Sequence, residues 1–174
     1  MDKVSHSPFF SVIIPVYNKE KHIERALNSV MDQSFQDFEI IVVCDPSTDK
    51  SNSIVENYPS DKIRTFYRDE PGPGGYAARN LGIKQSKGEW LAFLDADDEW
   101  LPDHLQTVFK LAKQNPDMYV IGAGWKSIGD SKSVMDKYYR NFQHNGPHEV
   151  TLVRYLEQGL HGKRPIHTSV ACIR

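Results

Sequence analysis

The feature that most constrains this chain is a repeated alternation of short apolar runs with segments of helical period. Strands are expected over residues 9–15 (FFSVIIP), 38–44 (FEIIVVC), 63–67, 90–94 (WLAFL) and 118–123. These runs are almost continuously apolar, which is typical of strands buried on both faces. We therefore predict an α/β fold in which helices flank a mostly parallel central sheet.

Amphipathic helices are expected between these strands. The clearest apolar stripe, with spacings of three and four residues, consists of Ile23, Ala26, Leu27, Val30 and Met31. Asn18 is the predicted N-cap of this helix. Shorter helices are expected at residues 54–58 and 77–85. Pro102 suits the first turn of another helix, whose apolar side consists of Leu101, Leu105, Val108, Phe109 and Ala112.

Beyond Gly124 the pattern weakens. Residues 127–147 are polar and irregular, residues 152–160 are expected to form a helix, and residues 166–173 a strand. We place the boundary between two subdomains here, with residues 1–123 in the first and residues 124–174 in the second.

Composition excludes several classes of protein. The chain has 174 residues, which suits one domain with a full core. With 21 basic and 23 acidic residues the net charge is −2, so no nucleic-acid partner is expected. Cys44 and Cys172 form neither a disulfide framework nor a zinc pattern, which predicts a cytoplasmic protein with reduced thiols. The apolar runs are far shorter than the roughly 20 residues that cross a bilayer.

Candidate site residues follow three of the predicted strands. In a parallel sheet the carboxyl ends of the strands form one edge, and ligands bind there. We therefore expect Pro15 and Tyr17, Asp45, and the segment from Asp95 through Ala96 to Asp97 to converge. The Tyr17 ring suits stacking on a planar base, although a tyrosine after a strand also commonly serves packing.

Three carboxylates, Asp95, Asp97 and Asp98, lie within four residues at the end of a buried strand. Such acids repel one another unless a cation lies between them. An oxygen-only arrangement suits Mg²⁺ or Mn²⁺, with water and diphosphate oxygens as the remaining ligands. The alternative is that the acids cap the next helix, and Asp98 or Glu99 can cap while Asp97 binds metal.

Two further side chains each have two interpretations. Asp45 suits accepting a hydrogen bond from the imino group of a base such as uracil, or forming an Asx-turn or helix cap. Arg79 follows the glycine-rich segment EPGPGGY (residues 70–76) and suits either a diphosphate or an ion pair with the aspartate cluster. Gly72, Gly74 and Gly75 permit close backbone approach to a ligand.

Three segments, in order, resemble the family 2 glycosyltransferases, which are inverting enzymes with the GT-A fold. They are SVIIPVYNKEKHIERALNSVMDQSFQDFEIIVVCDPSTDKS (residues 11–51), ARNLGI (78–83) and KGEWLAFLDADDEWLPDHL (87–105). The sequence departs from the family at Cys44-Asp45-Pro46, where two aspartates and a glycine are common. The resemblance implies a base and ribose pocket at Pro15, Tyr17 and Asp45, a donor contact at Arg79, and a D-x-D motif at Asp95, Ala96 and Asp97.

The resemblance also implies the reaction. An acceptor hydroxyl attacks the sugar of a nucleotide-diphosphate donor, expected to be a UDP-sugar, while Mn²⁺ or Mg²⁺ on Asp97 and Asp95 neutralises the leaving diphosphate. Residues 1–123 are then the nucleotide-sugar-binding subdomain, and residues 124–174 begin the acceptor-binding subdomain. The general base is expected beyond Arg174, so this chain is expected to bind donor with metal but to transfer sugar slowly or not at all.

The implied acceptor is a saccharide or a lipid-linked saccharide in surface polysaccharide synthesis, which adds peripheral association with the inner face of the membrane to the expected cytoplasmic location. Two alternatives remain open. One is a non-catalytic nucleotide-sugar-binding module, and the other is a sugar nucleotidyltransferase. The second needs a glycine-rich, basic loop after the first strand, where this chain has Pro15-Val16-Tyr17-Asn18.

Overall fold

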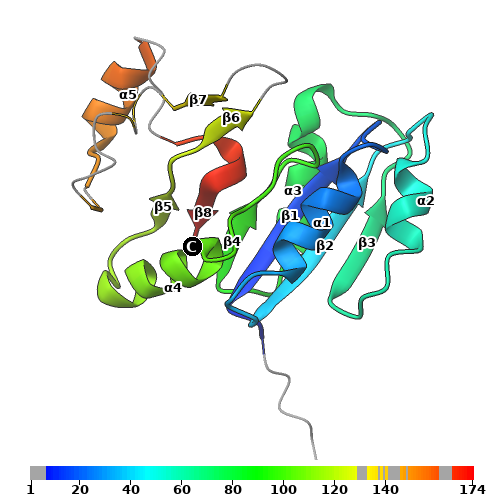
Figure 1. The fold of residues 1–174 in the computed structure, drawn as a ribbon, viewed down its shortest axis with the longest axis horizontal. Helices are drawn as coiled ribbons and strands as arrows, with labels where there is room; N and C mark the ends of the chain where they lie inside the picture. The colour runs from blue at the N-terminus through cyan, green and yellow to red at the C-terminus, as the bar shows by residue number, and fades with distance from the viewer. Residues whose placement is uncertain are drawn as a thin grey trace, which may run out of the picture. The chain divides into compact units, whose positions relative to one another are not determined.

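A computed structural model gives the fold of this chain (Figure 1). It describes residues 7–128, 133–136, 138, 140, 146–147, 149–160 and 166–174, without the side chains of Pro73, Leu152 and Gly159. These residues form two compact units. The first consists of Met1–Ile121 with Cys172–Arg174, and the second is Gly122–Ala171.

The central sheet has six strands and is mostly parallel, as predicted. Its order is β3 (Ile63–Tyr67), β2 (Phe38–Cys44), β1 (Phe10–Val16), β4 (Trp90–Phe93), β8 (Ala171–Ile173) and β5 (Val120–Gly122). Strands β1 to β4 run parallel to their neighbours, and β8 pairs with β4 in the antiparallel direction. The carboxyl ends of β1, β2 and β4 therefore lie at one edge, which is uppermost in Figure 1.

Helices cover both faces of this sheet. On one face α1 (Ile23–Met31), α2 (Ser51–Glu56) and α4 (His104–Gln114) contribute to the large core cluster. On the other face α3 (Tyr76–Gln85) packs on Ile41 and Val43 through Ala78. Successive residues of β2 point to opposite faces and all are buried, which explains why its sequence is continuously apolar.

Several local predictions were wrong. Helix α1 begins after a turn at residues 20–22, and its N-cap is His22, because the Asn18 side chain accepts instead from the Thr48 amide at 2.8 Å. Helix α4 begins at His104, so Leu101 lies before it and is 81% exposed. Asp98 and Glu99 are therefore too early to cap α4, whose N-cap residue is Asp103.

The second unit contains a small hairpin that the sequence analysis missed. Strands β6 (Lys126–Ile128) and β7 (Ser133–Met135) pair antiparallel within a stretch predicted to be irregular. Each strand is short and mostly exposed, so neither leaves an apolar pattern. Helix α5 (Leu152–Leu160) is present as predicted. The predicted strand at residues 166–173 is divided into a 3-10 helix (Thr168–Val170) followed by β8.

Among the residues that the structure describes, no helix combines the length and apolar character needed to span a bilayer.

Candidate functional site

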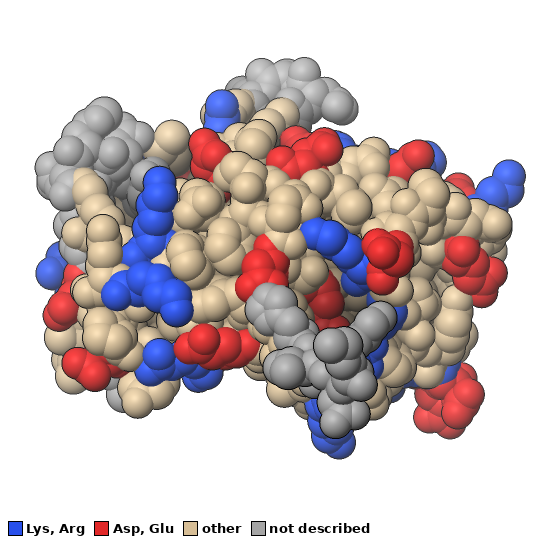
Figure 2. All heavy atoms as spheres, turned by 90° about the horizontal axis from the view of Figure 1, so that it is seen from below, with Lys and Arg blue, Asp and Glu red and all other residues tan. Residues whose placement is uncertain are grey.

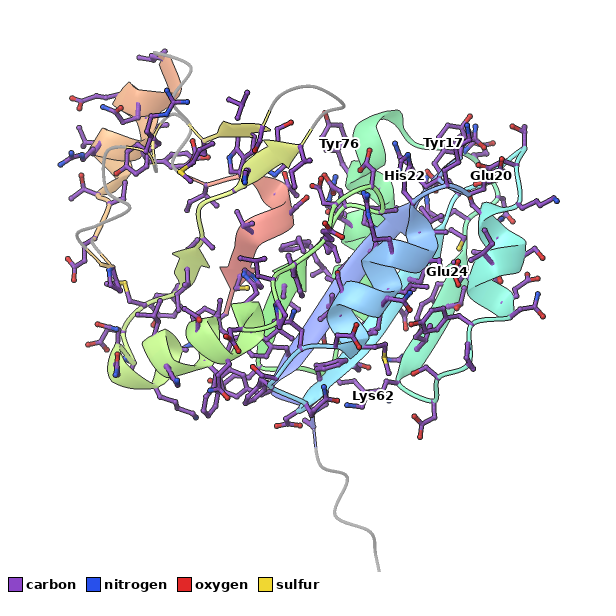
Figure 3. The ribbon with its side chains drawn as sticks, in the orientation of Figure 1. Tyr17, Glu20, His22, Glu24, Lys62 and Tyr76 are labelled. Carbon is purple, nitrogen blue, oxygen red and sulfur yellow. The ribbon has the colours of Figure 1, made fainter. Side chains whose placement is uncertain are left out.

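A cavity of about 340 Å³ opens at the carboxyl edge of the sheet in the first unit. All seven residues predicted for the site line it, although they come from segments far apart in the sequence. Figure 3 shows the labelled Tyr17 at this edge and Lys62 at the opposite one. The cavity is lined by Pro15, Val16, Tyr17, Lys19, Asp45, Gly72, Gly74, Gly75, Arg79, Asp95, Ala96 and Asp97.

Two hydrogen bonds of Asn18, one as donor and one as acceptor, connect the loop after β1 to the loop after β2. Asn18 adopts the left-handed conformation (φ 52°), which asparagine tolerates better than most residues. Its amide donates to Ser47 Oγ at 3.1 Å, while its own Oδ1 accepts from the Thr48 amide. The Tyr17 side chain is 48% exposed at the cavity, so core packing does not account for its position.

Asp45 directly follows β2 and is buried, with only 3% of the residue exposed. Arg68 Nη1 donates to its Oδ1 at 2.6 Å, and the Gly72 amide donates to its Oδ2 at 3.2 Å. The carboxylate is thus fixed by a residue that the sequence analysis did not select. The missed signal was positional, because Arg68 directly follows β3 and so lies at the same edge.

Arg79 forms an ion pair with Asp95, which was one of its two predicted roles. The same guanidinium donates through Nη1 to the Gly74 carbonyl at 3.2 Å. Gly75 has φ 74°, and a Cβ there would lie 3.1 Å from Arg79 Nη1, so glycine leaves room for the arginine. Both members of the pair line the cavity.

Asp97 is held by two cations from the β1–α1 region, neither of them selected from the sequence. Lys19 Nζ donates to Asp97 Oδ2 at 2.8 Å, and Arg25 Nη2 donates to the Asp97 carbonyl at 2.9 Å. Burial alone would raise the pKa of the Asp97 carboxyl, but the hydrogen bond and charge of Lys19 hold this pKa below its usual value. The carboxylate therefore stays ionised at neutral pH.

The donor set at the cavity suits a small divalent cation. Asp95 and Asp97 offer carboxylate oxygens, and within the described part of the chain no group of three or more His, Cys, Asp or Glu is placed to hold a metal. Mg²⁺ commonly takes one or two protein carboxylates and completes its coordination with water and phosphate oxygens. The two aspartates therefore fit such an ion in the presence of a diphosphate.

A second cavity, of about 440 Å³, lies along the exposed side of α1 and contains none of the seven predicted residues. Its walls carry both signs of charge, including Arg25 and Glu99, whose Nε and Oε2 atoms are 3.5 Å apart. Glu20 and Glu24, which also line it, are labelled in Figure 3. Its mixed charge favours no class of ligand.

Comparison with known proteins agrees with the fold described above. Solved structures that resemble the fold are GT-A glycosyltransferases. The family model described as "Glycosyl transferase family 2" matches residues 11–165 of this chain. The chain therefore belongs to glycosyltransferase family 2.

This chain is similar in sequence and in fold to named proteins that are longer than it is. A GalNAc(5)-diNAcBac-PP-undecaprenol beta-1,3-glucosyltransferase of Campylobacter jejuni is 38% identical over 109 residues, which cover 62% of this chain and 35% of that protein. Residues 1–349 of S. aureus TarS, in complex with UDP-GlcNAc, match with a TM-score of 0.66 and 32% identity over 74% of this chain and 38% of that one.

A third match, to the Pyrobaculum calidifontis mannosyltransferase PcManGT in complex with GDP-Man and Mn²⁺, has a TM-score of 0.68. It is 24% identical and covers 97% of this chain and 45% of that one, so it supports the fold alone. The first curated relatives are longer proteins, and the matched part of this chain covers between 15% and 41% of their lengths.

Proposed function

We propose that this chain binds the nucleotide part of a sugar donor, a UDP-sugar, in the cavity at the carboxyl edge of its sheet. The observation that carries the proposal is the convergence of all seven predicted residues on that one cavity. The enzyme would move the sugar, with inversion, to a hydroxyl of a saccharide or lipid-linked saccharide. The name of the Campylobacter relative, which includes an undecaprenol-diphosphate-linked saccharide, supports a lipid-linked acceptor. The setting that we propose is surface polysaccharide synthesis at the inner face of the membrane.

The base pocket is supported by Asp45 and Tyr17. Each oxygen of the Asp45 carboxylate accepts one hydrogen bond from the protein and keeps further acceptor capacity. Uracil presents an imino N–H donor that such an acceptor recognises. The half-exposed ring of Tyr17 lines the same cavity and suits stacking on the base.

We propose that the diphosphate lies beside the aspartates and the basic side chains that line the cavity. Arg79 suits bidentate contact with phosphate oxygens, and its pairing with Asp95 orients the guanidinium toward the cavity. Asp97, with Asp95, would hold Mn²⁺ or Mg²⁺. A bound ion of this kind neutralises negative charge that develops on the departing nucleoside diphosphate.

The general base is not assigned to any described residue. The carboxylates that line the cavity are Asp45, Asp95 and Asp97, and each is paired with a cation: Arg68, Arg79 and Lys19, respectively. A carboxylate committed to such a pair is poorly placed to take a proton from an acceptor hydroxyl. The proposal for this chain therefore concerns donor binding.

Calorimetry tests this proposal with UDP, GDP and dTDP, each titrated with and without Mn²⁺. We expect UDP to bind most tightly, and only with the metal. Asp97→Ala should weaken the metal-dependent binding at least about 10-fold, which is the lower end of what loss of an outer partner of a metal ligand costs.

The matched control is Asp61→Ala, which removes the same charge at an exposed position before β3. It should leave the affinity unchanged. Equal affinity for the three nucleotides, with no effect of metal or of Asp97→Ala, would contradict the proposed site.

A further inference from the structure

Lys19 forms an ion pair with the Asp97 carboxylate, which is the proposed ligand of the metal. Its Nζ lies 2.8 Å from Asp97 Oδ2, with the two side chains 36% and 45% exposed. The Lys19 backbone is fixed, because its amide donates to Ser51 Oγ at 2.6 Å and its carbonyl accepts from the amides of His22 and Ile23. The side chain alone can therefore leave Asp97 without any change in the loop.

Arg25 holds Asp97 in a different way. Its Nη2 donates to the Asp97 main-chain carbonyl, and its Nε faces Glu99. Arg25 therefore restrains the position of the residue, whereas Lys19 neutralises its charge. A cation that replaces Lys19 at the carboxylate leaves the Arg25 contact intact.

We propose that Lys19 is an internal counter-ion that competes with the divalent cation for Asp97 and moves to the diphosphate when the cation binds. This inference rests on the proposed function. Two positive charges at one carboxylate repel each other, so binding of the metal favours departure of the ammonium. Lys19 lines the same cavity as Arg79, and a lysine ammonium is an effective point-charge partner for phosphate oxygens.

The consequence is that metal and nucleotide bind together. Metal alone must displace Lys19 into solvent. Metal with a diphosphate supplies the ammonium with a new anionic partner, so the displacement is offset. Lys19 is thus a residue that couples the two binding events, and the coupling must be reciprocal.

The test compares Lys19→Met with wild type in two titrations. Mn²⁺ alone is followed by the electron paramagnetic resonance signal of the unbound ion, and UDP is then titrated by calorimetry at saturating Mn²⁺. We expect Lys19→Met to tighten the binding of Mn²⁺ alone about two- to fivefold, which corresponds to one exposed ion pair. It should weaken UDP binding about 10-fold through loss of a charged hydrogen bond.

Two variants serve as controls. Lys21→Met removes the same charge two residues away, at an exposed position outside the cavity, and should change neither titration. Arg25→Met should weaken Mn²⁺ binding with or without UDP, because it loosens the Asp97 backbone. Circular dichroism of each variant verifies that the fold is retained.

The outcomes separate the two proposals. Unchanged or weaker binding of Mn²⁺ alone in Lys19→Met would overturn the competition, provided that Asp97→Ala weakens Mn²⁺ binding. Unchanged UDP affinity in Lys19→Met would overturn the transfer to the diphosphate. If Asp97→Ala does not affect Mn²⁺ binding, the proposed metal site itself is wrong.

Discussion

The two edges of the central sheet both carry acids paired with arginines, yet they differ in what surrounds those pairs. At the carboxyl edge, Asp45 pairs with Arg68 and Asp95 pairs with Arg79 around a cavity. At the amino edge, Glu39 accepts from Arg64 Nη1 at 2.8 Å, from Ser11 Oγ at 2.7 Å and from the Lys87 amide at 2.7 Å.

At the amino edge, the hydrogen bonds of the Glu39 carboxylate are all made with other parts of the protein. Ser11 Oγ also accepts from the Gly88 amide at 2.8 Å, and a Cβ on Gly88 would lie 2.5 Å from the Ser11 nitrogen. Glu39 thus serves to join β2 to the segment that enters β4. Figure 2 views the molecule from this side, where acidic and basic side chains lie interspersed.

The comparison shows that an acid–arginine pair does not by itself identify a ligand site. What distinguishes the carboxyl edge is space beside the paired groups, which lets a ligand exchange for the protein partner. An acid–arginine pair that has no cavity beside it, such as Glu39 with Arg64, has a structural role. Substitutions at the two edges should therefore separate stability from nucleotide binding.

The largest effect is expected for Asp45→Ala. This substitution leaves the largely buried Arg68 without its counter-charge, so the free energy of unfolding should fall by about 3 to 5 kcal/mol, measured by urea denaturation. UDP binding should also be lost, because the proposed base acceptor is removed.

A double-mutant cycle with Arg68→Met tests the cause of that loss. The double variant should be less destabilised than the sum of the two single variants, since no unpaired buried charge remains. Additive destabilisation would show that the pair is not the source of the effect. Retained UDP affinity in Asp45→Ala would show that the nucleobase binds at another place.

Much of this edge was predictable from the sequence because it depends on backbone topology. Once Asp45 and Asp97 were placed directly after parallel strands, their convergence followed from the fold. Lys19 and Arg68 were missed, although both follow strands, because long basic side chains have no motif and their partners are set by packing in three dimensions. The start of α4 was misplaced because Pro102 suits a helix terminus in general and does not fix the turn.

The intermediate effect is expected for Glu39→Gln at the amino edge. The amide retains hydrogen-bonding capacity but loses its charge beside Arg64, so the free energy of unfolding at pH 7 should fall by about 1 to 3 kcal/mol. UDP affinity should stay within about twofold of wild type, because Glu39 does not line the cavity and distant sites act independently. A loss of UDP affinity comparable with that of Asp45→Ala would break the distinction between the two edges.

The pH dependence of the same variant sharpens this prediction. Burial alone would raise the pKa of the Glu39 carboxyl, but the bonds from Ser11, Arg64 and the Lys87 amide lower it overall. A group with a lowered folded pKa stabilises the protein above its ordinary pKa, about 4.3, and loses that contribution as the pH falls through the folded value. The difference in unfolding free energy between wild type and Glu39→Gln should therefore shrink below about pH 4.

The smallest effect at neutral pH is expected for His104→Phe, which concerns a half-buried titratable group with no ion pair in the described structure. Burial lowers the pKa of His104 to about 4, and its ring lies against Trp100 with centroids 4.5 Å apart. Phenylalanine keeps this ring contact and removes the titration, so the free energy of unfolding at pH 7 should change by less than about 1 kcal/mol.

The stability of wild type and that of His104→Phe should differ at lower pH. Since the unfolded histidine takes up a proton near pH 6.5 and the folded one only near pH 4, wild type should lose stability across that interval. His104→Phe should lose less, and urea denaturation at half-unit pH steps measures the difference between the two proteins. If the two proteins have parallel pH profiles from 7 to 4, then His104 is protonated in the folded state, and burial without a charged partner does not keep it neutral.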